Sequence, residues 1–128
     1  MAAAHAYASM NSDDHNFLES IGVELSAMLA TGPPDRPKVI GTLNLLRSSM
    51  LLHFSQEETL MRKHNYPGFF HHKFSHDYII TNLSVFVSSF TTGREKASAH
   101  VWPTLKTALD NHIARYDNAL SSFMDTLA

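Results

Sequence analysis

The sequence predicts an all-α fold, an antiparallel up-down-up-down four-helix bundle with a dimetal site in its core. In four segments, apolar residues recur every three or four positions, and each segment is too long for a strand. Clusters of proline, glycine and polar residues separate these segments. Ionisable residues interrupt the apolar faces at positions that meet in one layer of such a bundle. We expect the helices at about residues 13–31, 38–64, 69–92 and 103–126 of the sequence.

Length and composition narrow the classes of function. A chain of 128 residues fits one domain spanning 1–128. Its net charge of −2 favours neither nucleic acid nor an anionic membrane as a partner. The chain has no cysteine, which excludes disulfides, cysteine-bound zinc and iron–sulfur clusters. It also lacks the run of about 20 apolar residues of a spanning helix and the pattern of a secretory signal. We therefore expect a cytoplasmic protein with no membrane or nucleic-acid partner.

The breaks between the expected helices have clear chemical causes. The first, residues 31–37, contains three prolines, which cannot continue a helix. The second, residues 65–68, begins with Asn65, a residue that tolerates the left-handed conformation in which many helices end. The third begins at Thr91-Thr-Gly93 and reaches Pro103. The short first and second connections favour antiparallel neighbours.

Along each helix the inward positions are spaced by alternating steps of three and four, as in helical bundles. On the last helix this spacing predicts an inward row of Leu105, Leu109, His112, Tyr116, Leu120 and Phe123. Six ionisable residues occupy inward positions that should be apolar: His15, His53, Glu57, His72, His76 and His112. Burying such groups without partners costs about 1–3 kcal/mol each. Some interaction must offset this cost.

The topology brings these residues together. His15 lies near the start of the first expected helix, His53 and Glu57 near the end of the second, His72 and His76 at the start of the third, and His112 late in the fourth. In an up-down-up-down bundle, these positions share one end. The pairs 53/57 and 72/76 are spaced i, i+4, so each pair shares a helix face. Asp117 lies about 140° from His112 on a regular helix, so both can face the core only if the helix distorts there, for example in a π-bulge.

The resulting donors are five imidazoles and two carboxylates. Nitrogen and oxygen donors without sulfur suit iron, manganese, zinc or copper. They exceed the needs of one ion. For two ions that each take about six ligands, two bridging carboxylates, five histidines and one shared solvent-derived oxygen leave one position open. Such a vacancy suits one small ligand, and O2 suits a ferrous pair.

At these residues the chain resembles the hemerythrin family, in particular bacterial hemerythrins. The stretch His53-Phe-Ser-Gln-Glu57-Glu-Thr-Leu-Met61 resembles the family's HF-x-x-EE-x-x-M motif, and His112-Ile-Ala-Arg-Tyr-Asp117 its HI-x-x-x-D element. Tyr66-Pro67, His72-Lys-Phe-Ser-His76 and His15 also match in type and spacing. The resemblance covers nearly the whole chain. The sequence departs from it at Ala108, where the family usually has tryptophan, and at Asp14, where it usually has glutamine.

The resemblance implies a non-haem protein that binds O2 reversibly for storage, transport or delivery, and that is not an enzyme. It implies two iron ions (Fe2+/Fe3+) bridged by Glu57, Asp117 and an oxo or hydroxo group. His72, His76 and His112 would bind the ion without a vacancy, and His15 and His53 the ion that takes O2 or a small anion. Leu109 and Ile113 are the expected walls of the O2 pocket, and Glu58 is expected to be solvated.

Three other functions are weighed against O2 carriage. An O2 or redox sensor could use the same domain, excised from a longer chain with a signalling output domain. A ferritin-like diiron oxidase or peroxidase would use Glu-x-x-His pairs, which the sequence lacks. A zinc hydrolase would carry His-Glu-x-x-His, which is also missing. O2 carriage is therefore the favoured prediction and the sensor its alternative.

Overall fold

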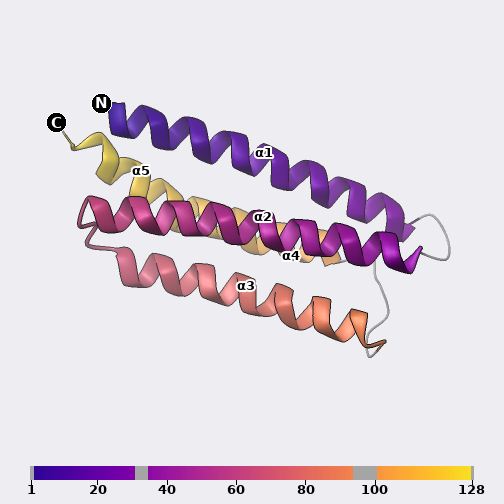
Figure 1. Ribbon diagram of the computed structural model, residues 1–128. Coiled ribbons are helices and arrows are strands. Elements are labelled where there is room, and N and C mark those ends of the chain that lie inside the picture. The colour runs from indigo at the N-terminus through magenta and orange to yellow at the C-terminus, as the bar shows by residue number, and fades with distance from the viewer. Residues whose placement is uncertain (1, 31–34, 94–100, 128) are drawn as a thin grey trace.

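The computed structural model describes residues 2–30, 35–93 and 101–127. Its helices are α1 (Ala2–Ala30), α2 (Arg36–Lys63), α3 (Phe69–Thr91), α4 (Val101–His112), the π-helical segment η1 (Ile113–Asp117) and α5 (Asn118–Asp125). The last three follow one another as a fourth rod, and neighbouring rods run antiparallel, with both termini at one end of the bundle (Figure 1). The predicted fold class is confirmed. None of the helices described is long and apolar enough to cross a membrane.

The sequence signals at the helix ends act as expected where they are described. The Asp35 side chain accepts a hydrogen bond of 3.3 Å from the backbone N–H of Lys38 and so caps the start of α2. Asn65 has a φ of 52°, the left-handed conformation predicted for the end of α2. Residues 31–34 and 94–100, which form parts of the first and third breaks, lie outside the described residues.

The first helix differs from the prediction. It begins at Ala2, well before position 13, so His15 lies in the middle of α1 and not near its start. The alanine-rich stretch before His15 suits a helix, because alanine has the highest helix propensity. Tyr7 in this stretch is buried, so tertiary packing also holds the added turns.

The core consists of two apolar clusters on either side of a polar layer. The larger cluster includes Leu25, Leu43, Leu46, Met50, Leu83 and Trp102. The smaller includes Tyr7, Met61, Leu120 and Met124. The layer between them holds the buried polar residues His53, Glu57, His72, His76, His112 and Asp117. Apolar contacts on both sides therefore fix the helices that carry these polar groups.

The π-helical segment changes which residues of the fourth rod face the core. Asp117, Leu120 and Met124 are buried, whereas Tyr116 and Phe123 are only partly buried. At positions 116 and 123 the predicted inward row therefore lies at the edge of the core, and Phe123 still packs against the smaller cluster. A π-turn contains one residue more than an α-turn, so the positions after it take a new phase. The distortion predicted between His112 and Asp117 is present.

Gly22 allows α1 to approach α4 closely. It faces Trp102, and a Cβ atom built on Gly22 would overlap the indole ring. Trp102 itself is buried in the larger apolar cluster. Gly22 thus acts through its missing side chain, which leaves space for the largest aromatic ring in the chain.

We expect Gly22→Ala to lower the free energy of unfolding by about 1–3 kcal/mol, because the added methyl group forces the Trp102 ring to move. The matched control is Gly41→Ala in α2, where an added Cβ meets no heavy atom within 4 Å. The control should stabilise the protein by about 0.5–1 kcal/mol, since alanine favours the helix. Urea unfolding monitored by circular dichroism measures both changes. Equal effects of the two substitutions would contradict the close packing.

Candidate metal centre

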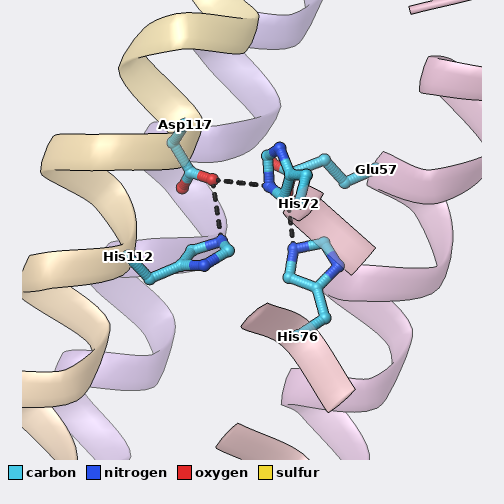
Figure 2. A group of neighbouring side chains, drawn as sticks. All are labelled: Glu57, His72, His76, His112 and Asp117. Atoms are coloured by element: carbon cyan, nitrogen blue, oxygen red, sulfur yellow. Dashed lines mark hydrogen bonds and ion pairs between the residues drawn. The ribbon is translucent and has the colours of Figure 1, made fainter. Parts of the chain in front are cut away.

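Five buried polar side chains from three rods meet at the centre of the polar layer (Figure 2). Glu57 comes from α2, His72 and His76 from α3, His112 from the last residue of α4 and Asp117 from the last residue of η1. Each offers one nitrogen or oxygen atom, and these atoms all lie within 4.8 Å of one another. This is a compact group of donors with a shape suited to a metal ion.

A second group lies next to the first. One donor atom each from His15, His53 and Asp117 also fall within 4.8 Å of one another. Asp117 therefore belongs to both groups. Glu57 approaches the second group too, because its Oε2 atom lies 3.9 Å from Nε2 of His53. Two carboxylates thus lie between two sets of histidines.

The donor and acceptor atoms inside the layer lie close together, but several of them make no hydrogen bond. Nε2 of His72 lies 2.6 Å from Oε1 of Glu57 and 3.1 Å from Oδ1 of Asp117. Nε2 of His112 lies 3.0 Å from the same Asp117 oxygen. These close approaches lack hydrogen-bond geometry: Nε2 of both histidines and both Asp117 oxygens have no hydrogen-bond partner among the described residues. The lone pairs converge on a common space, as they do in a metal site.

The outward ring nitrogens of three histidines are held by other side chains. Nδ1 of His53 lies 2.7 Å from Oδ2 of Asp14, and Nδ1 of His76 lies 2.9 Å from Oε2 of Glu58. Nδ1 of His112 lies 2.7 Å from Oγ of Ser75. Metal-binding histidines commonly hold their second ring nitrogen in this way, which fixes the tautomer and the ring orientation. The prediction that Glu58 is solvated was wrong, because this side chain is largely covered and contacts His76.

The local backbone explains how each pair of donors reaches the layer. His53 and Glu57, and likewise His72 and His76, are separated by about one α-helical turn and therefore lie on one face. His112 and Asp117 are five residues apart and would diverge on a regular α-helix. In η1 the repeat is i to i+5, which brings Asp117 over His112. The π-helical segment therefore allows Asp117 to belong to both groups of donors.

Burial and charge pull the pKa values of the layer in opposite directions. Burial would raise the pKa of Glu57, but His72 and His76 lower it to about 2. Burial would lower the pKa of His72, but Asp117 and Glu57 raise it to about 9. Despite its burial, the pKa of Asp117 is held well below its usual range by its histidine neighbours. Without a metal, the two carboxylates are therefore ionised and His72 carries a compensating proton.

The structure brings all seven predicted donor residues into the two adjacent groups: His15, His53, Glu57, His72, His76, His112 and Asp117. Leu109 and Ile113 line a hollow of about 290 Å³ beside His15. Sequence reasoning did not assign Tyr7, whose hydroxyl donates a hydrogen bond of 2.9 Å to Oε2 of Glu57. Continued backwards from Leu18 through His15, the alternating steps of three and four reach positions 11 and 8, so the spacing did not mark Tyr7 as an inward residue.

The raised pKa of His72 predicts a pH dependence for the metal-free protein. A protonated His72 stabilises the fold fully below pH 6.5, and this contribution is lost as the pH rises through about 9. We therefore expect the free energy of unfolding to fall between pH 6.5 and 9. Urea unfolding after chelator treatment tests this, with His72→Gln as the control that should remove the dependence. A flat or rising profile in the unsubstituted protein would contradict a protonated His72.

Comparison with known proteins finds relatives that are similar in sequence and in fold. A bacteriohemerythrin from Methylococcus capsulatus is 28% identical over 105 residues, which are 82% of this chain and 79% of that protein. A crystal structure of wild-type hemerythrin is similar with a TM-score of 0.80 and 26% identity, over 86% of this chain and 83% of the other. A point mutant of hemerythrin has a TM-score of 0.81 at 25% identity, over 87% and 83% of the two chains. No protein-family model matches the chain.

The likeness extends over most of both chains in sequence as well as in fold. It agrees with the motifs around His53, His72 and His112, which bring their side chains into one layer. The chain is thus similar to hemerythrins in sequence, in fold and in the residues that form the polar layer.

Proposed function

We propose that this protein binds O2 reversibly at a pair of non-haem iron ions in the polar layer. The observation that carries the proposal is the position of Asp117, which is shared between two groups of histidines whose donor atoms lie within 4.8 Å of one another. A carboxylate between two such groups suits a pair of ions. The relatives named hemerythrin and bacteriohemerythrin support iron and O2 over other metals and ligands.

The proposed division of ligands follows the two groups. His72, His76 and His112 would hold one ion, and His15 and His53 the other, with Glu57 and Asp117 bridging. The first ion would then have three histidines and the second only two. The second ion would therefore keep a position for O2 or a small anion. A pair of ferrous ions would supply the two electrons with which O2 is held.

The chain's own residues would admit O2 while limiting water. The hollow beside His15 is lined by apolar Leu18, Trp102, Leu109 and Ile113 as well as by polar residues. O2 is small and uncharged, so an apolar wall favours it over anions and ordered water. Leu109 is buried and lies one turn before His112. We propose that Leu109 and Ile113 form the inner wall of the ligand pocket.

A binding protein fits this donor set better than an oxidase does. Five histidines and two carboxylates donate less negative charge than the carboxylate-rich sites of ferritin-like oxidases. They therefore stabilise highly oxidised iron less well. We propose O2 binding as the function, with no chemical transformation of a second substrate.

The central test is iron loading without O2, followed by exposure to air. We expect two iron ions per chain and a visible charge-transfer band that appears with O2 and disappears when O2 is removed. Metal analysis and absorption spectroscopy measure both. One iron per chain, or a band that cannot be reversed, would overturn the proposal.

Substitution of a ligand should remove iron selectively. We expect His72→Ala to lower iron binding by about 10-fold or more, because a buried donor is lost. His71→Ala is the matched control, since His71 is the neighbouring histidine but is exposed. It should bind iron as the unsubstituted protein does. Equal loss in both variants would place the metal elsewhere.

Ala108 should affect the lifetime of the oxygenated protein. It lines a groove of about 410 Å³ between α3 and α4 that also reaches Ser75 and His112. We expect Ala108→Trp to fill this groove, to keep water from the Ser75–His112 contact and to slow autoxidation. Absorption decay of the oxygenated form measures the rate. Ala119→Trp, at an exposed position of α5, is the control, and an unchanged lifetime in Ala108→Trp would argue against this role of the groove.

A further inference from the structure

Helix α1 contacts the polar layer through two side chains that are not among the proposed ligands. Tyr7 and Asp14 lie about two turns apart and flank the layer on the same side as His15. Each makes one hydrogen bond to a proposed ligand on α2. The two hydrogen bonds act in opposite directions. Tyr7 donates to a carboxylate, whereas the Asp14 carboxylate accepts from a histidine ring.

Asp14 adds negative charge to the ligand set. Its Oδ2 atom lies 2.7 Å from Nδ1 of His53, a ring that is only 2% exposed. When Nε2 of His53 faces a metal, Nδ1 must carry the ring proton and donate it to the carboxylate. An ionised acceptor draws this proton toward itself and makes the imidazole a stronger electron donor. A stronger donor favours the ferric state of the ion that it binds.

Tyr7 withdraws negative charge from the ligand set. Its hydroxyl donates a hydrogen bond of 2.9 Å to Oε2 of Glu57, and both side chains are buried. A carboxylate that accepts a hydrogen bond shares its charge with the donor and so gives less to a metal. The surroundings of low polarity strengthen this effect. The contact of Tyr7 therefore favours the ferrous state of the ions that Glu57 would bridge.

We propose that α1 sets how readily the metal centre is oxidised through two opposed hydrogen bonds, with Asp14 favouring the oxidised state and Tyr7 the reduced state. The inference rests on the proposed function, because it requires an iron pair in the layer. It assigns Tyr7 and Asp14 as positioning residues that act through Glu57 and His53. Neither residue would touch iron or O2.

The test compares the midpoint potential of the iron-loaded chain in four variants by anaerobic redox titration. Asp14→Asn should shift the potential to a more positive value, and Tyr7→Phe should shift it to a more negative value. Asp13→Asn removes the same charge at the adjacent exposed position, and Tyr78→Phe removes an exposed hydroxyl from a side chain that is 62% exposed. Both controls should keep the potential of the unsubstituted protein.

The affinity for iron gives a second readout that does not depend on O2. Loss of a side chain that orients a metal ligand commonly weakens metal binding by about 10- to 100-fold. We expect Asp14→Asn to weaken the binding of one of the two ions by about 10-fold, whereas Asp14→Glu, which keeps the charge, should restore most of the affinity and the potential. Competition with a ferrous chelator measures this.

The possible outcomes separate the two hypotheses. Shifts of the potential in the same direction in Asp14→Asn and Tyr7→Phe would show a general loosening of the site and overturn the inference. Unchanged potentials in both variants, in a chain that holds two irons, would overturn the inference alone. Failure of the unsubstituted chain to bind an iron pair would overturn the proposed function and the inference together. If Asp14→Asn lost its iron, an unaltered potential in Tyr7→Phe would still count against the inference.

Discussion

The burial of four histidines and two carboxylates in one layer of the core is the constraint on which the rest of the structure depends. Each such group would cost about 1–3 kcal/mol if it lost its partners. Ion pairs between the histidines and the two carboxylates offset part of this cost, and apolar clusters on both sides hold the helices in place. Long helices are needed for this arrangement, since each must cross the larger cluster, the polar layer and, in most cases, the smaller cluster.

Much of this arrangement could be predicted from the sequence, because helical periodicity and antiparallel topology together determine where a residue lies. His53 and Glu57 share a face on α2, and His72 and His76 share one on α3, for purely geometric reasons. The mismatch between His112 and Asp117 even predicted a distortion, and η1 lies between them. These inferences needed only distances along the chain.

Other features depend on tertiary contacts that local patterns do not determine. The alanine-rich start is helical in part because Tyr7 is buried in one cluster with Met61 and Met124. The local sequence pattern does not determine this contact. The contact between Glu58 and His76 requires the precise side-chain placement of two neighbouring helices. A charged residue next to a ligand is solvated in most helices, so the sequence alone favoured the wrong environment for Glu58. Side-chain contacts of this kind follow from packing and not from spacing.

The π-helical segment links the polar layer to the packing of α5 against the smaller cluster. All positions after Asp117 follow the phase set by one extra residue, so Leu120 and Met124 enter the smaller cluster together with Tyr7. A single-residue deletion in η1 would force a choice between two registers. In one register Asp117 would leave the layer, and in the other the apolar side of α5 would turn toward solvent. The extra residue in η1 thus places Asp117 in both groups of donors and also determines which face of α5 packs against the smaller cluster. A change in one would therefore change the other.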